Sequence, residues 1–361
     1  MNKSFINSNK RIKSGTHRIN HLKQNISNSN IIDYKQFFSN RNKVNSKSKE
    51  VVVGIDFGSS GSGFAYSFFN ENNIIHGNIF GANVDNKVPT EIILDDNLNT
   101  LKFGADCIQY MKENPNKTGH YFKGIKMHLY QKKTVIQSKN TGKVFSLKIV
   151  IQKILEQIKK LAIEEVRKNR SSLDESQFKW VVTVPAIWEE FEKSIMMSAC
   201  IGAGLIDENT DKSLFFALEP EAASIYCSRN KEIDPKCVEK GKLYIVCDLG
   251  GGTGDIVTHL VGENKSLKEI ESACGGNFGS NEIDKRFFKE IIYRLFGFED
   301  FNSFYKRYKL SKIKDKETEE TLFGEWNELE REIKDFKEGT NLINQNIQLI
   351  YLSFKNYTRK I

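Results

Sequence analysis

Three consecutive glycines lie in the middle of a strand-forming stretch, and this feature constrains the fold more than any other in the sequence. The stretch reads YIVCDLGGGTGDIVTHLV and runs from Tyr244 to Val261. A tight turn needs one or two glycines, because a residue without a Cβ adopts left-handed backbone and allows close approach. A third glycine between apolar flanks therefore indicates a β-hairpin whose turn is approached by another group, and a ligand is one candidate.

A second turn of small residues lies near the start of the ordered pattern. The sequence VVVGIDFGSSGSGFAYSFF begins at Val51 and predicts another hairpin, with Asp56 just before its turn. Glycine-bearing turns direct several backbone N–H groups at one point and can wrap phosphate oxygens. Either turn alone is equally explained as a plain strand connection. The two together, separated by a long α/β pattern, predict two lobes that hold one polyphosphate between them.

Carboxylates beside both turns indicate a cation. Asp56 and Asp248 would repel phosphate groups unless a positive ion lies between them, and Mg²⁺ held largely through waters fits this arrangement. Neither turn is a Walker loop, because G-x-x-x-x-G-K-[ST] does not occur, and neither is the G-x-G-x-x-G of dinucleotide-binding proteins. We therefore expect Asp56 and Asp248 to be the metal-site residues.

Between the two turns, predicted strands alternate with predicted helices. Apolar residues recur at three and four positions from Ser146 to Arg170, which predicts a long amphipathic helix. The run FKWVVTVPAIW predicts a strand buried on both faces, a helix follows over 189–203, and LFFALEPEAASIYC predicts a strand that enters a helix. This alternation predicts the α/β class. We expect a first lobe over 51–240 and a second over 241–361.

Four polar residues outside these motifs have simpler interpretations. His120 and His128 have no partner pattern, so we expect both on the surface. Asp95 and Asp96 are typical of a turn between two short strands.

The net charge of +8 belongs to the amino-terminal region. Residues 1–50 contain 11 of the 54 basic residues and 2 of the 46 acidic residues, so the remainder is nearly neutral. This Asn-, Lys- and Ser-rich segment predicts a disordered tail, with a transit peptide or a nucleic-acid arm as alternatives. Scattered cysteines and the lack of an apolar run of eighteen residues favour a cytoplasmic protein without membrane or specific nucleic-acid partners.

Four motifs, in order, resemble the nucleotide-binding domain of the 70-kDa heat-shock proteins: GIDFGSS, VVTVPAIW, LEPEAASIY and DLGGGTGD. The resemblance covers about residues 51–337. The segments IKMHLY and ALEPEAASIYC are most similar to the divergent heat shock 70 kDa protein 12 branch. The resemblance implies a two-lobed actin-like ATPase fold, a duplicated ribonuclease H-like architecture. It also implies ATP or ADP with Mg²⁺, slow hydrolysis, and signalling by lobe closure to protein clients or co-chaperones.

The resemblance also assigns roles to individual residues. The first phosphate loop contains Gly58, Ser59 and Ser60, the second contains Gly250, Gly251, Gly252 and Thr253, and the adenosine side contains Gly275, Gly276, Gly279, Ser280 and Lys334. The implied catalytic residues are Lys126, Glu219, Asp248, Thr253 and Asp255, with Lys123 as the alternative lysine. Several positions depart from the family pattern: Leu218 replaces an asparagine, Gly254 a phenylalanine and Ser280 a glycine, while Ser59 and Ser60 replace a threonine pair and keep both hydroxyls.

The sequence ends at Ile361, before the later glycine pair and the peptide-binding domain that the family has. We therefore expect the second lobe to be incomplete. Two alternatives follow: an interaction module or pseudo-ATPase without turnover, and a sugar kinase on the same fold. The kinase would need an acidic base in a sugar pocket, and no such residue is evident in the sequence.

Overall fold

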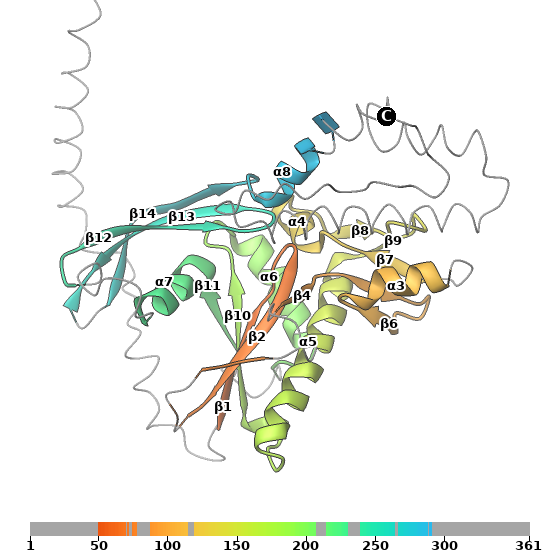
Figure 1. The fold of residues 1–361 in the computed structure, drawn as a ribbon, viewed down its shortest axis with the longest axis horizontal. Coiled ribbons are helices and arrows are strands. Elements are labelled where there is room, and N and C mark those ends of the chain that lie inside the picture. Colours follow the sequence, from red (N-terminus) through yellow and green to blue (C-terminus); the bar gives the residue numbers. More distant parts are fainter. Residues whose placement is uncertain are drawn as a thin grey trace, which may run out of the picture. The chain divides into compact units, whose positions relative to one another are not determined.

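The computed structural model describes residues 50–69, 71, 74–77, 87–114, 119–206, 214–229, 239–263, 266–287 and 289–290. Helices and strands are mixed in this part of the chain, as the sequence predicts (Figure 1). The described residues form two compact units. The larger contains those within 47–219, 249–254 and 275–290, and the smaller contains those within 220–248 and 255–274. The predicted tail (apart from Glu50) and Lys334 lie outside the described residues, and the predicted duplicated lobes stay a prediction.

A six-stranded sheet forms the centre of the larger unit. The strand order is β11-β10-β1-β2-β3, and β4 also pairs with β2. The strands are β1 (Val51–Asp56), β2 (Gly61–Phe68), β3 (Ile75–His76), β4 (Lys87–Pro89), β10 (Phe178–Val184) and β11 (Leu214–Leu218). β1 and β2 form the predicted antiparallel hairpin, whereas β10 runs parallel to both β1 and β11. In β10 alternate residues are buried and the others half-buried, so the prediction of full burial on both faces was too strong.

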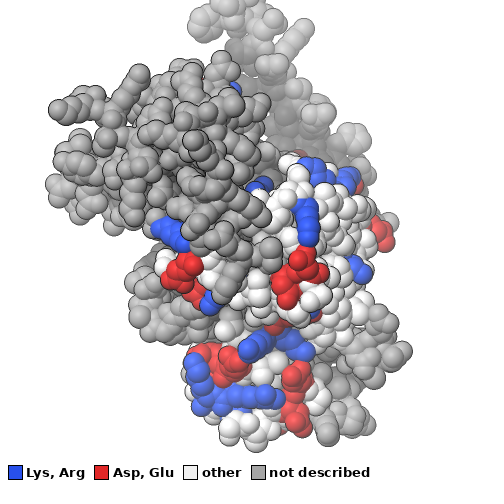
Figure 2. All heavy atoms as spheres, turned by 90° about the vertical axis from the view of Figure 1, so that its right-hand side faces the viewer, with Lys and Arg blue, Asp and Glu red and all other residues white. Residues whose placement is uncertain are grey.

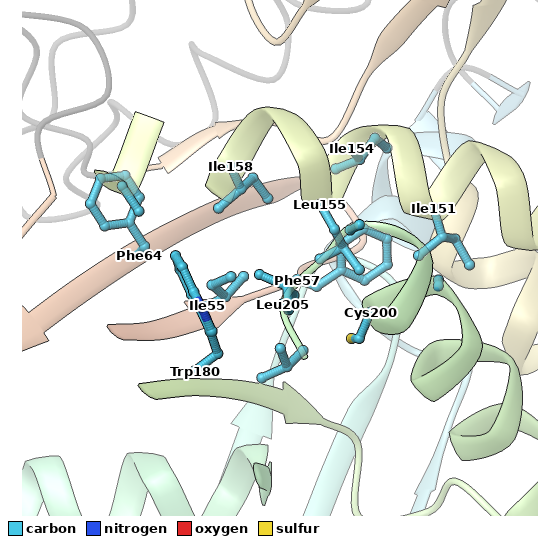
Figure 3. Packing of buried hydrophobic residues seen from close by; sticks show 14 of the residues in the cluster. Ile55, Phe57, Phe64, Ile151, Ile154, Leu155, Ile158, Trp180, Cys200 and Leu205 are labelled. Carbon is cyan, nitrogen blue, oxygen red and sulfur yellow. The ribbon is translucent and has the colours of Figure 1, made fainter. Parts of the chain in front are cut away.

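Two helices cover one face of this sheet. The predicted long helix is α5 (Leu147–Asn169), and α6 (Glu190–Gly202) follows β10. The apolar stripe of α5 points toward the sheet: Leu155 and Ile158 lie over Ile55 and Phe57 in Figure 3. Each such side chain contributes about 2 kcal/mol when it is fully buried. The 3.6-residue periodicity thus determines which face of α5 packs on the strands.

The rest of the larger unit consists of shorter elements. A three-stranded sheet has the order β6-β5-β7, and β8 pairs with β9. These strands are β5 (Ile92–Leu94), β6 (Thr100–Phe103), β7 (His120–Phe122), β8 (Val135–Gln137) and β9 (Val144–Ser146). The helices are α3 (Asp106–Glu113), α4 (Ile125–Tyr130), a 3-10 helix (Glu175–Gln177) and α8 (Ser280–Phe287). Asp95 accepts hydrogen bonds from the backbone N–H groups of Asn97 and Asn99, which confirms the predicted turn.

His120 is buried, so the prediction that it lies on the surface was wrong. Its ring is only 1% exposed; Nδ1 lies 2.7 Å from Thr141 Oγ1 and Nε2 lies 3.1 Å from Asp96 Oδ1. Both partners come from turns that are distant in sequence, which is why no local pattern indicated them. His128 is half-buried, and desolvation lowers the pKa of its ring.

The smaller unit contains α7 (Glu219–Arg229) from Pro220 onward and most of the sheet β12-β13-β14. Its strands are β12 (Leu243–Leu249), β13 (Gly254–Val261) and β14 (Leu267–Gly276). The Tyr244 hydroxyl lies 2.5 Å from Ser224 Oγ, and the Tyr244 ring packs edge-on against His259 at 5.6 Å. These contacts join α7 to the first two strands of the sheet.

Charged side chains of both signs are interspersed on the face shown in Figure 2. This mixture agrees with the near-neutral balance of the chain beyond residue 50. Among the helices in the described ranges, none combines the length and the apolar character that crossing a membrane requires.

Candidate functional site

The two turns of small residues lie against each other within the larger unit. A Cβ placed on Gly252 would be 2.5 Å from Ser59 Oγ, and one placed on Gly251 would be 2.8 Å from Ser60 Cβ. Real Cβ atoms essentially never come within 3.0 Å of another heavy atom. Glycine is therefore required at both positions for the turns to touch. The group that approaches the glycine run in this structure is the serine turn, at the place where the sequence suggested a ligand.

The glycine turn is closed by its own backbone. The N–H of Gly250 donates to the carbonyl of Thr253 at 3.0 Å, and Thr253 itself is buried. In the serine turn, a Cβ on Gly58 would overlap the carbonyl of Gly61. Each turn therefore depends on a position where no side chain fits.

The start of α8 is attached to the glycine turn. The backbone N–H groups of Ser280 and Asn281 donate to the carbonyls of Gly250 and Gly251 at 3.0 Å and 2.8 Å. The Ser60 hydroxyl donates to Asn281 Oδ1 at 3.1 Å. The first N–H groups of a helix have no partner inside the helix, and here the turn satisfies them.

Gly279 brings α8 close enough for these bonds. A Cβ on Gly279 would lie 2.6 Å from the carbonyl oxygen of Gly251, and the Gly279 N–H donates to Gly252 at 3.3 Å. The preceding ring, Phe278, packs on Gly254 and Gly276, where a Cβ on Gly254 would lie 2.5 Å from Cε2 of the ring. Phe278 therefore occupies the space over Gly254, the position at which the chain departs from the family's phenylalanine.

Of the two candidate lysines, Lys126 is the one joined to Glu219. Lys126 is only 5% exposed, and its Nζ lies 2.5 Å from Glu219 Oε1. It also lies 5.8 Å from the centroid of the Trp188 ring, within reach of a cation–π interaction. Lys123 precedes α4 and is half-buried. The helix α4 and the first residue of α7, directly after β11, thus bring Lys126 and Glu219 together.

The Lys126 segment lies beside both turns. Ser59 Oγ lies 3.8 Å from Met127 Sδ, and a Cβ on Gly252 would overlap the same sulfur. One residue of α4 therefore contacts the serine turn and faces the glycine turn, while its neighbour pairs with Glu219. The contacts among the two turns, α4 and α8 bring together most of the predicted site residues of the larger unit.

Asp56 has two partners in the sheet. Its Oδ2 lies 2.5 Å from Lys87 Nζ, and its Oδ1 accepts a hydrogen bond from Thr183 Oγ1 at 3.4 Å. Sequence reasoning missed Lys87 and Thr183, because only the pairing of strands distant in sequence places them beside Asp56.

Asp248 and Asp255 belong to the smaller unit, where Asp255 is 1% exposed. Gly275 and Gly276 end β14. In the larger unit, the groups around the two turns are of the types that bind a phosphate and its hydrated Mg²⁺: two hydroxyls, backbone N–H groups, a carboxylate and a lysine. They surround glycines, and any added Cβ would fill the space that these glycines leave.

The family model for Hsp70 protein matches residues 113–322, more than half of the chain. The chain belongs to the Hsp70 family. Human heat shock 70 kDa protein 12A is 31% identical over 315 residues, which cover 70% of this chain and 46% of that protein. Human heat shock 70 kDa protein 12B is 30% identical over 322 residues, which cover 71% and 46%. Both likenesses confirm the predicted branch, and the chain spans about half the length of these Hsp70 relatives.

Proposed function

We propose that this Hsp70-family chain binds ATP and ADP together with Mg²⁺ and hydrolyses ATP slowly. One observation carries the proposal: the serine turn and the glycine turn meet, and Met127 places the Lys126–Glu219 pair next to them. The family membership supports the same conclusion, since nucleotide binding belongs to the Hsp70 domain that the matched residues resemble.

The two turns would bind phosphate oxygens. Ser59 and Ser60 offer hydroxyls, and the Gly250–Gly252 turn offers backbone N–H groups on residues without side chains of their own. Because the turns are in direct contact, binding requires them to separate by about the width of a phosphate group. The contacts that open are side-chain contacts to Ser59 and Ser60, whereas the bonds between the glycine turn and α8 can persist.

Asp56 is the residue of the larger unit that would orient waters around Mg²⁺. The ion, when bound, would neutralise charge on the phosphates, as in other phosphoryl-transfer sites. The roles predicted for Asp248 and Asp255 stay predictions. For the adenosine side we propose Gly275, Gly276, Gly279 and Ser280.

Lys126 and Glu219 are the proposed catalytic pair. The ammonium of Lys126 would stabilise negative charge that develops on the phosphate oxygens. Glu219, once separated from Lys126, would accept a hydrogen bond from the attacking water and orient it. In this structure the two groups form an ion pair with each other. We further propose that the nucleotide state is reported to protein clients or co-chaperones in the cytoplasm.

Calorimetric titration of the chain with ATP and Mg²⁺ tests binding, and phosphate release tests turnover. We expect Glu219→Gln to retain affinity within threefold and to lose turnover by about 100-fold, typical of a lost water-orienting group. Glu190→Gln, at an exposed position of α6, is the matched control and should behave as the unmodified chain.

The possible results discriminate between the candidate functions. No binding heat from a chain with a cooperative unfolding transition would contradict the proposal. Tight binding without phosphate release would support the alternative of a non-catalytic interaction module. A phosphorylated sugar in a screen of sugars with ATP would support the kinase.

A further inference from the structure

Asp56, Gly63 and Lys87 form one row across three neighbouring strands. In the register of the sheet, Gly63 of β2 lies opposite Asp56 of β1 on one side and opposite Lys87 of β4 on the other. Directly opposite residues project from the same face of a sheet. Asp56 and Lys87 are thus two strand spacings apart, about 10 Å. They share a face, with a residue that has no side chain between them.

The middle strand carries no side chain at Gly61 or Gly63, and a Cβ placed on Gly61 would lie 3.4 Å from Lys87 Cβ and 3.9 Å from Lys87 Cδ. Lys87 Nζ lies 2.5 Å from Asp56 Oδ2. An extended lysine side chain is long enough to reach this carboxylate from the Cα of Lys87. The row continues on the other side of Asp56 with Thr183 of β10, whose hydroxyl contacts the second carboxylate oxygen at 3.4 Å.

The exposure of this pair argues against a purely structural role. The side chains of Lys87 and Asp56 are 57% and 38% exposed. An ion pair that solvent reaches this easily contributes at most about 1 kcal/mol to stability. The same exposure makes the pair accessible to a ligand. An ammonium group has three N–H donors, so it can contact a carboxylate and a phosphate oxygen at the same time.

We propose that Lys87 is a built-in cation of the nucleotide site, which neutralises Asp56 and binds a phosphate oxygen when Mg²⁺ is absent. The inference rests on the proposed function and adds a specificity-determining residue to it. Without Lys87, a nucleoside triphosphate would meet an uncompensated carboxylate and would depend on the divalent ion. With Lys87, the chain retains part of its affinity for ATP after the metal is removed.

The experiment compares ATP affinity in excess Mg²⁺ and in excess EDTA by calorimetry. In the unmodified chain, we expect chelation of Mg²⁺ to weaken ATP binding by less than about tenfold. In Lys87→Met, the factor by which chelation weakens ATP binding should be at least tenfold larger. In Mg²⁺ the two proteins should agree within threefold. Lys148→Met, at an exposed position of α5, is the matched control, and Lys87→Arg should preserve the original ratio.

A second variant tests the charge argument directly. Asp56→Asn in the Lys87→Met background removes the repelling carboxylate, so binding in EDTA should recover at least fivefold. The role of Lys87 would be overturned if Lys87→Met lost ATP affinity equally in Mg²⁺ and in EDTA, or if the ratio of the two affinities were the same as in the unmodified chain. Either result would leave the proposed function intact. If the unmodified, folded chain bound ATP neither in Mg²⁺ nor in EDTA, the role of Lys87 and the proposed function would both be overturned.

Discussion

The ammonium of Lys126 lies 2.5 Å from Oε1 of Glu219, although the two residues are 93 positions apart in the sequence. Their side chains are only 6% and 14% exposed. Removing two charges from water costs several kcal/mol per ion, and a well-formed pair only roughly compensates for this. The pair is therefore poorly explained as a source of stability, which agrees with the catalytic role proposed for it.

Removing one partner should be far more damaging than removing both. We expect Lys126→Met to lower the free energy of unfolding by about 3 kcal/mol, because it leaves an enclosed carboxylate without its cation. The double variant Lys126→Met/Glu219→Gln should be less destabilised than Lys126→Met alone. Urea unfolding of the two single variants and the double variant gives the coupling energy. A coupling below about 0.5 kcal/mol, the scatter for independent sites, would show that the pair is absent in solution.

The contact between the two turns can be tested by a compensating pair of substitutions. Gly251→Ala should destabilise the chain by about 1–3 kcal/mol, since the new Cβ collides with the Ser60 side chain. In a Ser60→Gly background the same substitution should cost much less. Gly54→Ala is the control, because a Cβ there meets only the Ala65 carbonyl at 3.8 Å. Equal costs in both backgrounds would contradict the contact.

From the burial of the Cys200 thiol we expect the folded chain to lose stability at alkaline pH. Burial raises the pKa of its thiol from 9.0 to about 12. The folded chain thus holds this proton to higher pH than the unfolded chain, so unfolding releases a proton between pH 9 and about 12. Across this window the free energy of unfolding should fall by up to about 1.4 kcal/mol per pH unit. Relative to the unmodified chain, Cys200→Ala should lack this component and show a constant difference below pH 8.

His120 should contribute to the stability of the larger unit. His120→Ala removes the partner of Thr141 and Asp96, and we expect a loss of about 2 kcal/mol. His128→Ala is the comparison, since that ring is half-buried and bonds a single carbonyl, that of Gly124. Chemical unfolding of both variants measures the difference. A larger effect at His128 would show that the His120 contacts are not formed.

Local patterns predicted most of the elements. The spacing of apolar residues gave α5 within one residue at either end, and the glycine and serine turns were recognised from composition alone. The family motifs led to Lys126 and Glu219, because a motif preserves contacts that a single sequence cannot reveal. These features depend on local sequence or on family motifs, so they can be predicted without knowledge of the fold.

Long-range pairing was the part that could not be predicted. The register of β2 places Gly63 between Asp56 and Lys87, and no spacing in the sequence encodes that register. His120 is buried for a similar reason, since its partners arrive from two separate turns. Phe278 fills the space over Gly254 from the connection between β14 and α8. Each of these residues depends on strand or turn neighbours that sequence order leaves unspecified.

The hydrogen bonds from Gly279, Ser280 and Asn281 to the glycine turn have a mechanical consequence. Three successive amide groups join Gly279 and the first turn of α8 to three successive carbonyls. A ligand that displaces the Gly250–Gly252 backbone while these bonds persist would carry the start of α8 with it, so that the far end of the helix becomes a place where nucleotide occupancy can be detected.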